Sequence, residues 1–102
     1  MPYELEFTEL FVEQFEKLEK ANRERIYRKI QELKENPYRH KALTYPFGGC
    51  FRIRVGNFRV IYMPIERMKK VVLVDVGLRK KIYKRDISMV IDQISGRTPS
   101  QR

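Results

Sequence analysis

Residues 79–85 place one tyrosine, Tyr83, within a run of cations, RKKIYKR. A tyrosine side chain can take a proton from a reacting group, and nearby positive charge favours its ionised form. Arginine and lysine side chains bind phosphates and stabilise negative charge that develops in a transition state. These residue types at this spacing therefore indicate chemistry on a phosphate group. The alternative is a solvated strand end that carries an ordinary packing tyrosine.

A second set of cations lies in a stretch that predicts a β-hairpin, FRIRVGNFRVIY at residues 51–62. Apolar and basic residues alternate on either side of Gly56-Asn57, a pair that favours a two-residue turn. With that turn, one face carries three arginines and the other carries the apolar side chains. The basic set is Arg52, Arg54 and Arg59, and the apolar set is Phe51, Ile53, Val55, Phe58, Val60 and Tyr62.

In this register Arg54 lies directly opposite Arg59. Opposed like charges on neighbouring strands cost about 0.2–1 kcal/mol per pair. The face is therefore either open to an anion or neutralised by a nearby carboxylate, and Asp75 on the following strand is the obvious carboxylate. A solvated outer strand face is the simpler alternative.

The net charge of +9 comes entirely from the second half of the chain. Residues 1–49 hold nine Lys/Arg and nine Asp/Glu, whereas residues 50–102 hold thirteen and four. A basic excess confined to one region is typical of a nucleic-acid-binding surface. An acidic protein partner or an anionic membrane would also complement it.

Several classes of site are excluded by composition. Cys50 is the single cysteine and His40 the single histidine, so neither a disulfide nor a multi-histidine metal site is possible within the chain. Triad-type serine or cysteine catalysis is not expected. We find no signal peptide and no apolar run long enough to span a membrane, and the cytoplasm is the expected location.

The remaining segments predict the elements that position these side chains. Residues 3–7 alternate as a strand, and Thr8 suits the N-cap of a following helix. A second helix is expected from the N-cap Asn22 to Asn36. Residues 37–49 are expected to form a linker that Leu43, Tyr45 and Phe47 pin to the core. Residues 64–69 are expected to form a loop. An apolar central strand spans 71–76, and a last helix runs from Asp86 or Ser88 to Gly96.

These elements predict an α+β fold in the order β-α-α-β-β-β-α. It comprises an N-terminal strand, an antiparallel two-helix hairpin, a three-stranded antiparallel meander and a short C-terminal helix, with the helices packed on one sheet face. Residues 1–96 form a single domain and 97–102 a flexible tail. Tyr45 and Tyr62 are assigned to the core, and the stripe Ile87, Val90, Ile91 and Ile94 to intramolecular packing.

The element order, the segment FRIRVGNFRVIY and the valine-rich strand that leads into VGLRKKIYK resemble the RelE/ParE superfamily of toxins from type II toxin–antitoxin pairs. The likeness is to the RelE-like, archaeal-type messenger RNA interferases, which cut messenger RNA in the ribosomal A site. It implies catalytic roles for Arg59, Arg79 and Tyr83, without metal or cofactor. It implies RNA or ribosomal RNA binding by Arg52, Arg54, Lys80, Lys81, Lys84 and Arg85.

RNA supplies its own nucleophile for such a reaction, because a 2′-hydroxyl can attack the adjacent phosphate. We hypothesise that Tyr83 is the general base and that Arg59 and Arg79 stabilise the added negative charge. Lys84 is an alternative acid or base.

The resemblance leaves two other functions open. ParE-like members share the fold, lack the nuclease residues and inhibit DNA gyrase by binding it, and a third possibility is an inactive RNA-binding relative. A toxin implies a RelB-like antitoxin, acidic or amphipathic, that wraps the basic sheet. The other expected partners are the ribosome and messenger RNA, with no membrane; the free toxin is expected to be a monomer and the antitoxin-bound form a hetero-oligomer.

Overall fold

A computed structural model describes residues 2–96. Its strands are β1 (Glu4–Phe7), β2 (Lys41–Ala42), β3 (Phe51–Val55), β4 (Phe58–Ile65) and β5 (Lys70–Leu78). Its helices are α1 (Glu9–Glu16), α2 (Lys20–Gln31), α3 (Arg79–Ile82) and α4 (Ser88–Ser95), with 3₁₀ turns η1 (Glu32–Lys34) and η2 (Glu66–Met68). The predicted tail at 97–102 lies outside the described residues. Among residues 2–96, no helix is both long and apolar enough to cross a membrane.

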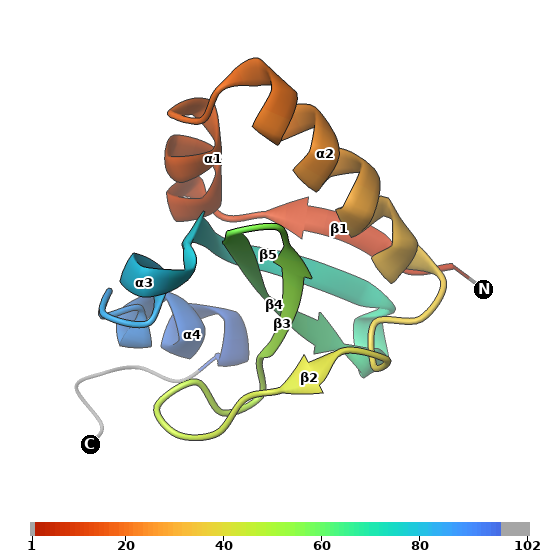
Figure 1. The fold of residues 1–102 in the computed structure, drawn as a ribbon. Coiled ribbons are helices and arrows are strands. Elements are labelled where there is room, and N and C mark those ends of the chain that lie inside the picture. Colours follow the sequence, from red (N-terminus) through yellow and green to blue (C-terminus); the bar gives the residue numbers. More distant parts are fainter. Residues whose placement is uncertain (1, 97–102) are drawn as a thin grey trace.

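The strands form one sheet in the order β1-β5-β4-β3-β2 (Figure 1). β1 runs parallel to β5, and the other neighbours are antiparallel. The predicted hairpin register is confirmed, with Val55 opposite Phe58 and Arg54 opposite Arg59. The α+β class and the order of the predicted elements are also confirmed. The sequence did not predict two short elements. β2 lies within the segment predicted to be a linker, and α3 lies within the segment predicted to be the basic end of the last strand.

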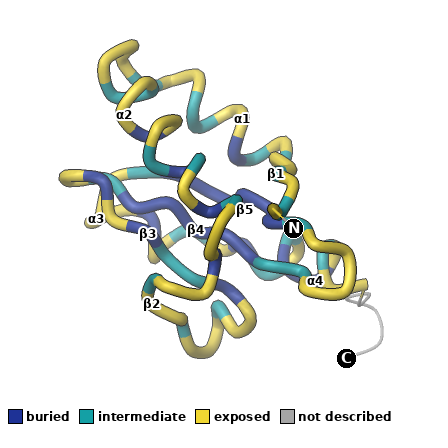
Figure 2. Tube along the Cα trace, turned by 90° about the vertical axis from the view of Figure 1, so that its right-hand side faces the viewer, coloured by how far each residue is buried: buried dark blue, intermediate teal, exposed yellow. Residues whose placement is uncertain are grey.

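The helices cover both faces of the sheet, so the expectation that all of them pack on one face is wrong for the C-terminal pair. α1 and α2 lie on one side of the strands and α4 on the other (Figure 1). The N-terminal core, beneath α1 and α2, contains Phe11, Ile26, Ile30, Leu33, Ile53, Val55, Val60, Tyr62, Val71, Leu73 and Val76. The C-terminal core, beneath α3 and α4, contains Cys50, Ile61, Met63, Val72, Val74, Ile82, Ile87 and Ile91. The strands between these two cores are the most deeply buried part of the chain (Figure 2).

Some predicted boundaries shift. α2 begins at Lys20 with Glu19 as its N-cap, so Asn22 lies inside the helix. β4 continues through Pro64, which the sequence predicted to end it. Proline is tolerated there because β3 begins at Phe51, opposite Tyr62, so that residues 63–65 of β4 pair with no strand on that side within residues 2–96.

A register shift between β4 and β5 changes which β5 side chains face which core. Ile61 lies opposite Asp75, but the next residue, Tyr62, lies opposite Leu73, so Val74 is an extra residue in β5. Such a bulge reverses the alternation of side chains beyond it. Asp75 therefore shares the face of Ile61, in the C-terminal core, and Val76 enters the N-terminal core.

Thr8 connects this bulge to the first helix. Its hydroxyl donates a hydrogen bond to the Val74 carbonyl at 2.8 Å and accepts one from the Phe11 backbone N–H at 3.0 Å. The second bond is the predicted N-cap of α1. One side chain thus satisfies a helix terminus and a carbonyl of the bulged strand.

We predict that Thr8→Val lowers the free energy of unfolding by about 1–2 kcal/mol, because valine keeps the shape and removes both hydrogen bonds. For a domain of this size each kcal/mol corresponds to a fall of about 4–8 °C in Tm. Thermal unfolding followed by circular dichroism measures it. Thr44→Val, at an exposed loop position, is the matched control, and equal Tm values for the two variants would contradict the prediction.

Candidate functional site

Arg59 is the buried centre of the predicted site. Its side chain extends from β4, and the residue is 5% exposed. One terminal nitrogen donates to the carbonyls of Gly56 and Phe58, at 3.0 and 2.9 Å. Gly56 supports this turn with a φ of 58°, a left-handed conformation that glycine adopts readily. The guanidinium is therefore fixed against the hairpin turn.

Four of the other predicted site residues lie close enough to Arg59 to change its pKa. Burial lowers the pKa of the Arg59 guanidinium most, and the positive charges of Arg54, Arg52 and Arg79 lower it further, whereas Tyr83 raises it. The fold thus brings residues from β3, β4, the start of α3 and the segment after it into one electrostatic group. We call the four arginines, Arg52, Arg54, Arg59 and Arg79, the basic face.

The start of α3 is joined to the hairpin turn by a backbone hydrogen bond. The Arg79 N–H donates to the Asn57 carbonyl at 2.8 Å. Ile82, the last residue of α3, is completely buried in the C-terminal core. Lys80 and Lys81 between them are exposed, as is Lys84 beyond them. The predicted cationic segment is therefore a helical turn anchored at both ends.

Tyr83 follows α3 and is 38% exposed. Its ring meets the ring of Phe47 edge-on, with centroids 5.9 Å apart and planes at 75°. A cavity of about 230 Å³ beside the two rings is lined by Pro46, Phe47, Tyr83, Lys84, Arg85, Asp86, Ile87 and Ser88. The sequence predicted that Phe47 pins the linker to the core, but not that it contacts Tyr83.

The charge of the basic face is not neutralised by carboxylates of the described chain. The ion pairs within residues 2–96 join Lys29 to Glu32, Lys69 to Glu66, Lys70 to Glu6 and Arg85 to Asp75. None involves an arginine of the basic face. Unpaired guanidinium groups beside a partly exposed tyrosine form a surface that can hold a phosphate and stabilise additional negative charge on it.

Asp75 does not neutralise the opposed pair Arg54 and Arg59, contrary to one of the two expectations. Its Oδ2 accepts a hydrogen bond from Nε of Arg85 at 2.8 Å, and its Oδ1 accepts one from the Val76 N–H at 2.8 Å. Arg85, predicted to bind RNA, therefore has part of its guanidinium occupied within the protein. The signal for this pair was an aspartate inside the apolar run VVLVDV, because a buried charge needs a partner.

Two residues assigned to the core have opposite outcomes. Tyr62 is fully buried and donates to the Pro37 carbonyl at 2.7 Å, as expected of a core tyrosine. Tyr45 is 92% exposed, so its assignment to the core is wrong. Leu43 and Phe47 pack against the C-terminal core. A turn at residues 45–46 interrupts the strand-like alternation that would have placed Tyr45 on their side. The stripe of α4 does pack inward, with Ile87 and Ile91 buried.

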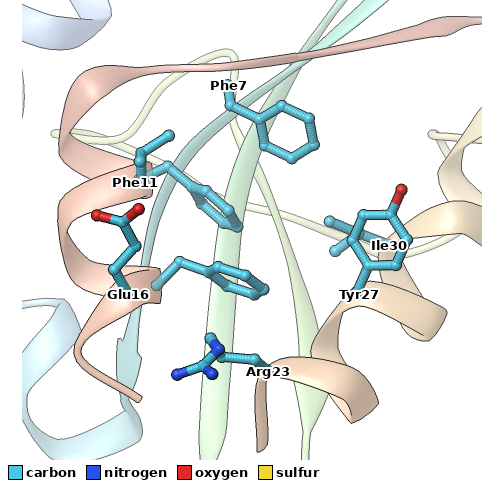
Figure 3. Close-up of a pocket in the computed structure, with 8 residues that line it drawn as sticks. Phe7, Phe11, Glu16, Arg23, Tyr27 and Ile30 are labelled. Carbon is cyan, nitrogen blue, oxygen red and sulfur yellow. The ribbon is translucent and has the colours of Figure 1, made fainter. Parts of the chain in front are cut away.

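A second surface, which the sequence did not predict, is an apolar groove between α1 and α2 (Figure 3). Its volume is about 620 Å³. Three of its side chains, Phe7, Val12 and Tyr27, are 40–52% exposed. Exposed large apolar groups that line one hollow commonly mark a contact surface. The groove is lined by Phe7, Phe11, Val12, Phe15, Glu16, Arg23, Tyr27 and Ile30.

Comparison with known proteins identifies relatives of this fold and site. A family model described as the ParE toxin of a type II toxin–antitoxin system, parDE, matches residues 5–83. A putative RelE-like toxin protein of Escherichia coli is 28% identical over 83 residues, which cover 79% of this chain and 87% of the relative. A putative toxin RelE4 of Methanocaldococcus jannaschii is 28% identical over 87 residues, or 81% and 93% of the two chains.

Among solved structures, the RelBE2 toxin–antitoxin complex of Mycobacterium tuberculosis superposes with a TM-score of 0.72 at 26% identity. The superposition covers 78% of this chain and 93% of the other. The residues of the basic face and of the groove all lie within the segment matched by the family model.

Proposed function

Because the chain belongs to the ParE toxin family of type II toxin–antitoxin systems and has RelE toxins as structural neighbours, we propose that it is a ribosome-dependent endoribonuclease. It is the toxin of a RelBE-type system. In this proposal it acts in the cytoplasm and cleaves messenger RNA in the ribosomal A site.

The observation that carries the proposal is the buried Arg59 beside a tyrosine and three other arginines, none of which forms an ion pair within residues 2–96. Four like charges held close together repel one another and oppose folding. A bound anion offsets this repulsion, so the arrangement favours an anion-binding role. Arg59 and Arg79 come from different elements, and the Arg79–Asn57 hydrogen bond holds those elements together. Such preorganised donors stabilise a transition state because they need no reorganisation as charge develops.

The proposed reaction uses the 2′-hydroxyl of the RNA as nucleophile. The phenolate of Tyr83 takes the proton from this hydroxyl as the oxygen forms a bond to the adjacent phosphorus. Arg59 and Arg79 stabilise the phosphorane, and the bond from phosphorus to the 5′-oxygen breaks. A 2′,3′-cyclic phosphate and a 5′-hydroxyl result, the leaving oxygen taking a proton from Lys84 or water. No step in this scheme uses a metal or cofactor.

RNA binding is proposed to rest on the cations around this centre, the half-buried Arg52 and the exposed Arg54, Lys80, Lys81 and Lys84. Each contact with a phosphate releases bound counterions, so affinity for the ribosome should fall steeply with salt.

The cognate antitoxin is the second proposed partner, and the apolar groove is its proposed anchor. An amphipathic helix can place apolar side chains against the exposed Phe7, Val12 and Tyr27. Glu16 and Arg23 also line the groove and can select charged groups on the helix flanks. The antitoxin chain is proposed to extend from the groove onto the basic face and neutralise its positive charge.

Gyrase inhibition is the second candidate function, because the matching family description is that of a ParE toxin. Inhibition of gyrase by binding requires no proton-transfer residue beside the arginines, whereas RNA cleavage does. A DNA supercoiling assay with gyrase therefore accompanies each cleavage assay below.

We predict that Arg79→Ala lowers cleavage of messenger RNA on programmed ribosomes by about 10²–10³-fold, the cost typical of removing one transition-state donor. Primer extension locates and quantifies the cuts. Arg28→Ala, which removes the same charge from an exposed site on α2, should cut normally. A folded wild-type protein, free of antitoxin, that cuts nothing would overturn the nuclease proposal.

Tyr83→Phe should lower the single-turnover cleavage rate by about 10²–10⁴-fold, the contribution typical of a general acid or base. Phenylalanine keeps the contact with Phe47 and removes only the hydroxyl. Tyr27→Phe, at another exposed tyrosine, is the control. Wild-type cleavage by Tyr83→Phe would exclude Tyr83 from proton transfer and leave Lys84 as the candidate base.

Tyr27→Glu should weaken antitoxin binding at least about tenfold, because a charge in the apolar groove must be desolvated on docking. Isothermal titration with the purified antitoxin measures the affinity. Met68→Glu, at an exposed methionine of η2, should bind normally, and Tyr27→Glu should still cleave RNA. Unchanged affinity would show that the antitoxin anchors elsewhere.

A further inference from the structure

We propose that Asp75 and Arg85 form a positioning pair, which holds Tyr83 at the basic face and does not itself contact RNA. The inference deepens the proposed nuclease function and rests on it. Arg85 Nε donates to Asp75 Oδ2 at 2.8 Å, and one terminal nitrogen of Arg85 lies 3.4 Å from Oε1 of Gln14 on α1. Arg85, two residues beyond the candidate base Tyr83, is therefore bound both to the sheet and to α1.

The bulge in β5 makes this pair possible. If β5 alternated regularly through Val74, Asp75 would face the N-terminal core and Val76 would point toward α3. With it, Asp75 is fully buried on the side where α3 and its following segment pack. The bulge thus delivers one carboxylate to the segment that carries Tyr83.

Two anchors flank Tyr83 in the sequence. Ile82 on one side is fully buried in the C-terminal core, and Arg85 on the other side is held by Asp75. Both anchors pack beside Gly77 of β5, where a Cβ would lie in ordinary van der Waals contact, 3.6 Å from an Arg85 nitrogen and 3.8 Å from the Ile82 Cβ. The exposed tyrosine therefore sits between an apolar anchor and an ionic anchor.

Stability alone does not explain a carboxylate at this position. Burial raises the pKa of Asp75, and the hydrogen bond and charge of Arg85 lower it only in part. The net shift means that the charged form of Asp75 opposes folding at neutral pH. Ion pairs of this kind often contribute less to stability than an apolar replacement. What this pair supplies is a fixed direction for the backbone on both sides of Tyr83.

A positioning role predicts a defect in the chemical step. Displacement of a reacting group by about 1 Å can cost about 10²-fold in rate. Loss of an RNA contact would instead weaken binding to the ribosome. The rate at saturating ribosome and the affinity for the ribosome therefore separate the two roles of Arg85.

Asp75→Asn is the primary variant, because it has the same shape and removes one acceptor. The amide oxygen can accept from Val76 N–H or from Arg85 Nε, but the amide nitrogen is a donor and cannot replace the second oxygen. Arg85→Ala and the double variant complete a cycle. Asp86→Asn, an exposed aspartate three residues beyond Tyr83, makes the same chemical change, and asparagine keeps the acceptor for the Ser88 N–H.

Two measurements are made on each variant after circular dichroism has shown it to be folded. The first is the single-turnover cleavage rate at saturating programmed ribosome, together with ribosome affinity. The second is the ¹⁹F NMR spectrum of full-length protein with 3-fluorotyrosine at position 83 only, which reports the environment of that ring without any reaction.

We expect Asp75→Asn and Arg85→Ala each to reduce the rate about 10–100-fold with affinity changed less than twofold. The double variant should be no slower than the slower single variant, and the ¹⁹F resonance should shift or broaden in all three but not in Asp86→Asn. Arg85→Lys, which keeps the charge on a different donor, should recover part of the rate.

Two results would overturn the inference: unchanged ¹⁹F spectra, or a loss of ribosome affinity with an unchanged rate. If the wild type cuts no RNA, the proposed function fails, while the ¹⁹F spectra still decide whether the pair positions Tyr83.

Discussion

The register shift between β4 and β5 is the constraint on which the site depends. One extra residue, Val74, reverses the side-chain alternation of β5 and divides its apolar residues between two cores. The same reversal brings Asp75 to the C-terminal side, where Arg85 meets it. Thr8 stabilises the arrangement by binding the Val74 carbonyl while capping α1. The first helix and the site segment are thereby coupled to one irregularity in the sheet.

Around this constraint the apolar cores are separated from the basic face. The two cores on either side of the sheet consist almost wholly of aliphatic and aromatic side chains. The basic face lies at the hairpin end of the sheet, where Arg59 is buried beside other arginines without an ion pair among the described residues. Like charges held together in this way are costly until an anion arrives, so the cores must supply the stability that the site removes.

The molecule presents two surfaces of different chemistry. The basic face suits a polyanion, and its attraction acts over a distance of roughly 8–10 Å at moderate salt. The groove between α1 and α2 is apolar and acts only on contact (Figure 3). Under the proposed function, this separation would let an antitoxin hold the toxin through one surface while it competes with RNA at the other.

Local patterns determined much of this protein. The alternation in FRIRVGNFRVIY and its two-residue turn predicted the register of β3 and β4, and the position of Thr8 predicted the cap of α1, because turns, caps and strand periodicity depend on neighbouring residues. They also predicted that Arg52, Arg54 and Arg59 share a face. Tertiary structure alone decided the bulge at Val74, the placement of α3 and α4 on the second face, and the pairing of Asp75 with Arg85. It also decided that Phe47 packs against Tyr83 while Tyr45 is exposed. Each of these depends on which distant residues fill the space beside a strand, and the order of residues along one segment carries no information about that.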